Sequence, residues 1–117
     1  MVEQIDPADV DELELDGVEP TLQAIGYELG ASAMRPNLWR YEPGESNERH
    51  RHDQQEELYY LIDGEVSLDV DGTPYTLSPG QFLLVEPSAW RRVSAHERST
   101  LFVVGVPNVA DDAIFDE

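Results

Sequence analysis

The sequence predicts an all-β domain, a small antiparallel β-barrel or sandwich of seven to nine short strands. Three observations support this fold class. Gly64, Gly72 and Gly80, each preceded by Asp or Pro, lie eight residues apart, which is typical of successive hairpin turns. Between the first two turns, Glu65–Val70 alternates polar and apolar side chains, as a strand with one solvated face does. No segment has a 3.6-residue apolar period over a useful length, so a helical domain is not expected.

The other strands are predicted where apolar and aromatic residues concentrate. Two early strands are expected, over Ile25–Leu29 and Asn37–Tyr41. Three later segments are more continuously apolar, which favours strands that are covered on both faces. These segments are Glu57–Ile62, Phe82–Val85 and Leu101–Val106.

The 117 residues fit one domain with two acidic ends. Residues 1–20 are interpreted as an acidic leader that lies against the domain or is partly loose, residues 21–107 as the β-barrel domain, and residues 108–117 as an acidic tail. Both ends are expected to be solvated. The acidic pair Asp111-Asp112 is therefore read as a solvated surface rather than a catalytic dyad.

Charge and composition exclude several classes of partner. The chain has 25 acidic and 7 basic residues, a formal net charge of −18, which argues against nucleic acid and anionic membranes as partners. All basic residues are Arg and none is Lys, a composition that suits very high salt, so we expect a halophile's cytoplasmic protein. There is no Cys, no apolar core of a signal peptide, and no apolar run of the roughly 20 residues that a membrane span needs.

The most informative segment contains His50 and His52. In an extended strand, residues i and i+2 point to the same face, so the two imidazoles can share one metal ion. A turn leads to Glu56-Glu57, where a carboxylate from the next strand can return to that ion. Two imidazoles and one carboxylate suit Fe, Mn, Zn or Ni as divalent ions. The spacing alone is equally compatible with two surface histidines among charged neighbours.

This segment resembles the first motif of the cupin superfamily, in which Gly, His-x-His, Glu and Gly follow at fixed spacing. The chain matches it without a gap, at Gly44, His50, His52, Glu57 and Gly64. The resemblance covers about residues 22–106 and implies a small, jelly-roll-like β-barrel of the double-stranded β-helix type, often a homodimer. It also implies that His50, His52 and Glu57 bind a metal, and it selects Glu57 over Glu56.

The second cupin motif is incomplete. Where the family has a fourth ligand histidine, this chain has Arg91, whose guanidinium stays protonated and has no lone pair to give. Either three ligands hold a metal beside Arg91, or Arg91 pairs with Glu57 and no metal binds. Arg91 is expected to face inward, although a register slip would place Arg92 there instead. His96 is a weak candidate for the missing ligand, because it falls near a predicted turn.

Alternation places further side chains in the pocket. Tyr59 shares a face with Glu57 and is a candidate catalytic acid or hydrogen-bond donor, with Glu57 assisting proton transfer. Trp39 and Tyr41 are candidate ligand-binding residues, as are Tyr59 and Arg91. The preferred function is a metal-binding cupin that binds or acts on a small organic molecule. The alternatives are a metal-free module that holds a small anion through Arg91 and the histidine pair, and a structural barrel without a ligand.

Overall fold

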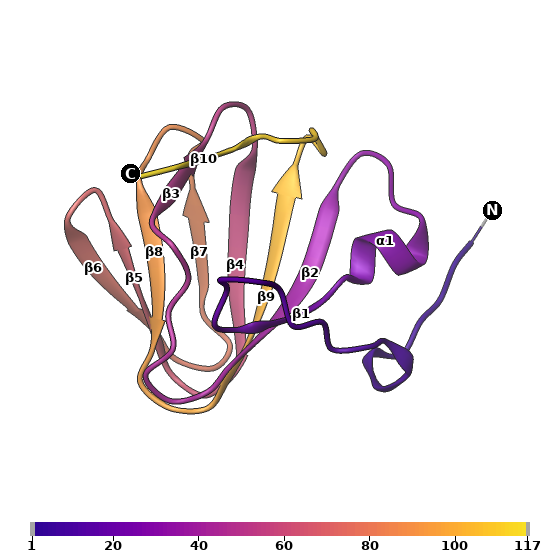
Figure 1. Ribbon diagram of the computed structural model, residues 1–117, viewed down its shortest axis with the longest axis horizontal. Helices are drawn as coiled ribbons and strands as arrows, with labels where there is room; N and C mark the ends of the chain where they lie inside the picture. Colours follow the sequence, from indigo (N-terminus) through magenta and orange to yellow (C-terminus); the bar gives the residue numbers. More distant parts are fainter. Residues whose placement is uncertain (1, 117) are drawn as a thin grey trace.

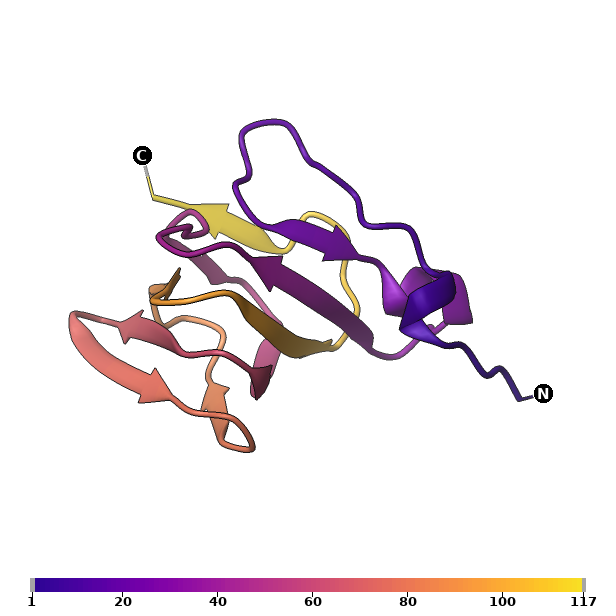
Figure 2. The same ribbon diagram turned by 90° about the horizontal axis from the view of Figure 1, so that it is seen from below.

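The computed structural model describes residues 2–116 and consists mainly of two five-stranded antiparallel sheets packed face to face (Figure 1; Figure 2). The first sheet has the strand order β1-β2-β9-β4-β7 and the second β10-β3-β8-β5-β6. The strands are β1 (Thr21–Gln23), β2 (Arg35–Tyr41), β3 (His50–His52), β4 (Glu56–Asp63), β5 (Val66–Val70), β6 (Thr73–Leu77), β7 (Phe82–Val85), β8 (Arg91–Ala95), β9 (Ser99–Val106) and β10 (Ala113–Phe115). The all-β prediction is confirmed, although residues 2–116 form ten strands instead of the seven to nine expected, arranged in two sheets.

The core lies between the sheets, where the inward faces of both meet. Leu61 and Leu101 of the first sheet are fully buried, as are Val66 and Leu68 of the second. Each such side chain contributes roughly 1.5–3 kcal/mol when it leaves water. The alternation predicted for Glu65–Val70 is confirmed, because its apolar positions supply part of this core.

One predicted strand is wrong. Ile25–Leu29 forms the short helix α1, which packs against β2. The helix ends at Gly30, which adopts a left-handed conformation with φ +72° and donates back to the helix carbonyls. A Cβ on Gly26 would lie 2.8 Å from Pro36 Cδ, so glycine lets the helix sit directly on the strand. Five residues are too few for an apolar period to separate a helix from a strand.

The two ends of the chain differ. A short 3-10 helix, η1 (Pro7–Asp9), begins the N-terminal segment, and a backbone bridge from Leu13 to Leu22 then fixes this segment against β1. The prediction that the C-terminal tail is solvated is wrong for residues 112–115. The strand β10 pairs with β3, and Asp112 is only 6% exposed. No helix in residues 2–116 is long and apolar enough to cross a membrane.

Candidate metal centre

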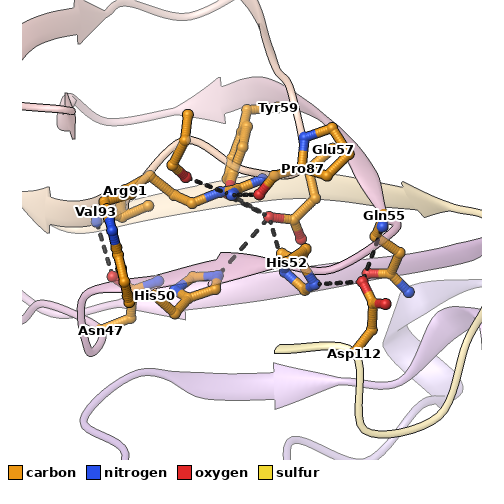
Figure 3. A network of polar contacts seen from close by, with 12 residues as sticks. Asn47, His50, His52, Gln55, Glu57, Tyr59, Pro87, Arg91, Val93 and Asp112 are labelled. Atoms are coloured by element: carbon orange, nitrogen blue, oxygen red, sulfur yellow. Dashed lines mark hydrogen bonds and ion pairs between the residues drawn. The ribbon is translucent and has the colours of Figure 1, made fainter. Parts of the chain in front are cut away.

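Three side chains from the two sheets converge on one point (Figure 3). His50 and His52 come from β3 and Glu57 from β4, and their side chains are only 8–12% exposed. Glu57 Oε1 lies 3.4 Å from His52 Nε2 and 3.8 Å from His50 Nε2, and all three ligand atoms lie within 4.8 Å of one another. Because bonds to a transition metal are about 2.0–2.2 Å long, donor atoms at this spacing fit around a single ion.

The local sequence explains this convergence. Alternation along β3 directs both imidazoles inward and Arg51 outward, where its guanidinium lies 5.3 Å from the Trp90 ring. The turn after β3 then carries the chain into β4 of the other sheet. The triad that the family resemblance implied is therefore brought together by a short connection between facing sheets.

The far side of each imidazole is also held. His50 Nδ1 lies 3.0 Å from the Glu48 carbonyl oxygen, and His52 Nδ1 lies 3.0 Å from Asp112 Oδ2. Both acceptors favour the tautomer in which Nδ1–H donates, so each Nε2 keeps a lone pair directed toward Glu57. This is the arrangement that metal-binding histidines ordinarily have.

Asp112 is a site residue that the sequence did not indicate. It lies directly before the C-terminal strand β10, is 6% exposed, and accepts hydrogen bonds from the backbone N–H groups of Gln54 and Gln55 at 3.0 and 2.8 Å. Burial raises its pKa, but these backbone donors and His52 outweigh it and lower the pKa below the ordinary value. Asp112 is thus a charged partner that orients His52. No local pattern distinguishes it from the exposed Asp111.

We predict that Asp112→Asn lowers the affinity for a divalent metal about 10- to 100-fold, because loss of the buried carboxylate leaves His52 less firmly oriented toward the metal. The affinity is measured by competition with a chromogenic chelator. Asp111→Asn, one residue away on an exposed side chain, is the matched control and should leave the affinity unchanged. Equal affinities in the two variants would refute a role for Asp112.

Glu57 Oε1 is the focus of further polar contacts. The Tyr59 hydroxyl donates to it at 2.7 Å, and Arg91 Nε lies 3.4 Å away. Burial raises the pKa of Glu57, but contacts with His50 and His52 outweigh burial and hold it well below the usual range. Burial and the neighbouring carboxylate raise the pKa of Tyr59, so its hydroxyl stays protonated as a donor. Glu57 is therefore ionised and oriented.

Arg91 faces inward as predicted, and Arg92 faces solvent. The Arg91 side chain is completely buried, and its Nη1 donates to the carbonyl oxygens of Pro87 and Ala89 at 2.9 and 2.7 Å. Arg92 is exposed, and its guanidinium donates hydrogen bonds to the Asn47 carbonyl oxygen and to Ser46 Oγ. Arg91 lies beside the Glu57 carboxylate (Figure 3) and is not among the residues that line the cavity.

The weak candidate His96 lies elsewhere, exposed and beside Ser67. It takes no part in the metal centre. His96 therefore does not replace the fourth ligand of the motif, whose position is occupied by Arg91.

A cavity of about 440 Å³ opens beside the triad. Trp39 and Tyr41 line it from β2 and Tyr59 from β4, which are the positions that alternation predicted. Leu101 and Val103 add an apolar wall. A larger depression of about 1320 Å³ beside the N-terminal segment is strongly acidic and does not include the triad. The site is therefore identified by the arrangement of the three metal-ligating side chains, and not by the volume of the cavity.

Comparison with known proteins assigns the family. The cupin domain family matches residues 37–106, so the chain belongs to the cupin family. No curated protein sequence matches it.

Many solved structures share the fold, and three of them illustrate the similarity to this chain. A polyketide cyclase, RemF from Streptomyces resistomycificus, is 17% identical with a TM-score of 0.84, covering 100% of this chain and 87% of that one. A sugar phosphate isomerase of the cupin superfamily from Silicibacter pomeroyi is 18% identical with a TM-score of 0.80, covering 97% and 92%. A protein assigned as a sugar phosphate isomerase from Acidithiobacillus ferrooxidans is 25% identical with a TM-score of 0.72, covering 82% and 64%.

Proposed function

We propose that this protein binds one divalent transition metal, Fe, Mn, Zn or Ni, and binds or acts on a small organic molecule in the adjacent cavity. The observation that supports this proposal is the convergence of two imidazole Nε2 atoms and one carboxylate oxygen, with both Nδ1 atoms hydrogen-bonded on the far side. When bound, the metal would supply Lewis acidity or a centre for oxygen chemistry.

The roles of the protein's own groups follow from their positions. Tyr59 holds the Glu57 carboxylate through its hydroxyl, and these two residues are the candidates for moving a proton to or from the ligand. Trp39 and Tyr41 present aromatic surface to a ligand in the cavity. The fold hosts many unrelated chemistries, so the reaction class must come from experiment.

The test is the metal content of protein purified in high salt without an affinity tag. We expect about one equivalent of a transition metal per chain, and its loss in the His50→Ala/His52→Ala variant. His96→Ala is the control, because this exposed histidine lies outside the triad. The proposal fails if the wild-type protein binds none of Fe(II), Mn(II), Zn(II) and Ni(II) on incubation.

A metal-free binding module is the second candidate, favoured by the close approach of Arg91 to Glu57. In this function Arg91 would supply the positive charge, and the histidine pair would hold a small anion. It predicts anion binding that Arg91→Ala abolishes and a chelator does not affect. This function is less well supported than metal binding, because the Arg91 side chain is buried and does not line the cavity in which an anion would bind.

A homodimer is proposed from one face of the first sheet. Its outward side carries two cross-strand rows of apolar side chains on β7, β4 and β9, which we call the apolar outer face. Phe82 and Leu84 on this face are 63% and 59% exposed. A neutral face on a chain of charge −18 suits a second copy, because its pairing brings few like charges together. The rows are Phe82, Tyr60 and Phe102, and Leu84, Leu58 and Val104.

We predict that Phe82→Glu converts a dimer of about twice 13.2 kDa into a monomer, as measured by light scattering. A buried charge in the apolar outer face would repel its copy and lose hydration. Tyr75→Glu, on the other sheet and 44% exposed, should remain dimeric. A monomeric wild-type protein would refute the interface.

The preference for high salt and the cytoplasmic location remain predictions. Refolding against salt concentration would test the first, and cell fractionation would test the second.

A further inference from the structure

A row of inward-facing positions crosses the first sheet beside the metal centre. Gly105 of β9 pairs with Arg35 of β2 on one side and with Glu57 of β4 on the other. Neighbouring strands lie about 4.8 Å apart, so Arg35 and Glu57 begin roughly 10 Å from each other. Glycine leaves the middle of this row without a side chain of its own.

The Gln55 side chain occupies that middle position. A Cβ on Gly105 would lie 2.5 Å from Gln55 Oε1 and 2.8 Å from Gln55 Cδ. Gly105 has no positive φ, so the glycine is needed for space rather than for backbone conformation. Gln55 lines the cavity and is itself only 3% exposed. Its backbone N–H is already bound to Asp112, which fixes the root of the side chain.

The terminal amide of Gln55 has an unused donor. Its Nε2 is buried and has no hydrogen-bond acceptor anywhere in residues 2–116. A buried amide nitrogen without an acceptor is unfavourable, so a water or a ligand oxygen is expected to pair with it. Because the Gln55 side chain lines the cavity, an oxygen of a molecule bound there is a candidate acceptor for this donor.

Arg35 supplies charge at the outer end of the same row. It is exposed, lines the cavity, and forms no ion pair with any carboxylate in the described part of the chain. The other charged side chains of the lining are Asp16, Glu48 and Glu57, and Glu57 belongs to the metal centre, so Arg35 is the only arginine or lysine that the cavity offers to a ligand away from the metal. One cation and one amide donor match a singly charged carboxylate, whereas a doubly charged phosphate would face the repulsion of Asp16 and Glu48.

We infer that the ligand of this cavity is a small carboxylate with a largely apolar body. Its carboxylate accepts from Gln55 Nε2 and faces Arg35, and its body packs against Trp39, Leu101 and Val103. This inference rests on the proposed function, because it takes the cavity beside the metal centre as the ligand site. It adds the substrate class and two specificity residues, Gln55 and Arg35.

The test compares benzoate with benzyl alcohol, and butyrate with butanol, by titration calorimetry on the zinc-loaded and the untreated protein. A carboxylate of either pair should bind at least about tenfold more tightly than its alcohol. Gln55→Leu and Arg35→Gln should each lower the affinity for the carboxylates more than the affinity for the alcohols and so remove most of that preference. Gln54→Leu and Arg51→Gln are the matched controls, because neither residue lines the cavity.

Gly105→Ala provides an independent check that alters no charge and no donor. Its methyl group displaces the Gln55 side chain, so this variant should lose the carboxylate preference as Gln55→Leu does. Its folding is confirmed by circular dichroism and by an unchanged metal content.

Metal content measured on the same samples separates the two proposals. Metal present without any preference for carboxylates, or without binding of either probe pair, overturns this inference alone. Metal absent overturns the proposed function, and the response of benzoate binding to Gln55→Leu then still decides the inference. A preference that survives Gln55→Leu shows that only water pairs with the amide, and it overturns the role of Gln55.

Discussion

Gly64→Ala is expected to lower the free energy of unfolding by about 3–5 kcal/mol, which is large for a change of one methyl group. Gly64 has φ +89°, a left-handed conformation that costs a residue with a Cβ about 1–2 kcal/mol. The added Cβ would also meet Ser99 Oγ and the Arg98 carbonyl oxygen, and it would lie 2.6 Å from Ser99 Cα. Backbone atoms cannot move aside as a flexible side chain can, so the overlap adds further cost.

The same contact has a hydrogen-bonding consequence. Ser99 Oγ accepts from the Glu65 backbone N–H at 3.0 Å and donates to the Glu97 carbonyl at 2.8 Å. Displacing this buried hydroxyl would break the link between the turn and the start of β9.

The chain offers a matched control in Gly80. It also has φ +89°, but no atom lies within 4 Å of a Cβ built there. Gly80→Ala should therefore cost only the conformational term of about 1–2 kcal/mol. Both variants are compared by urea unfolding at the salt concentration that keeps the wild-type protein folded. Equal losses in the two variants would mean that the contact with Ser99 has no energetic importance.

Arg91→Met is expected to raise the affinity for a divalent metal by about tenfold or more while it destabilises the metal-free protein. The guanidinium lies 3.4 Å from Glu57 Oε1, so a metal on that oxygen would have a buried cation nearby. Two unit charges about 5 Å apart repel by about 3 kcal/mol at an effective dielectric constant of 20. Removal of the arginine charge relieves that repulsion in the metal-bound state.

The metal-free state responds in the opposite direction. Without Arg91, the buried Glu57 carboxylate loses its cationic neighbour, which costs about 3 kcal/mol or more. Methionine keeps a long apolar side chain, so little packing is lost. Chelator competition gives the metal affinity, and urea unfolding with and without metal gives the two stabilities.

Arg92→Met is the adjacent control and should change neither quantity, because its side chain is exposed. An unchanged or lower metal affinity in Arg91→Met would show that the arginine acts only on the fold, through Pro87 and Ala89, or that no metal binds near it.

The sequence by itself determined the features that depend on local geometry. Alternation places His50 and His52 on one face of β3, and it lets only one of the adjacent Arg91 and Arg92 face inward. The residue count of the second cupin motif favoured Arg91, which is the buried one. The turn glycines separate the central strands at the predicted positions, because φ values near +86° to +89° are readily adopted only by glycine. The short connection after His52 predicted a carboxylate from Glu56 or Glu57 beside the two imidazoles, and the resemblance to the first cupin motif selected Glu57.

The tertiary structure decided the contacts between segments that are distant in sequence. Asp112 reaches His52 across 60 residues, and Gln55 lies over Gly105 across 50, with no periodicity to indicate either contact. Ile25–Leu29 became a helix because it packs on Pro36 and ends at a left-handed Gly30. Local periodicity fixes which face of a strand a side chain occupies. Long-range packing decides which distant segment covers that face. Because of this packing, the acidic C-terminal segment, which the sequence predicted to be solvated, lines the site.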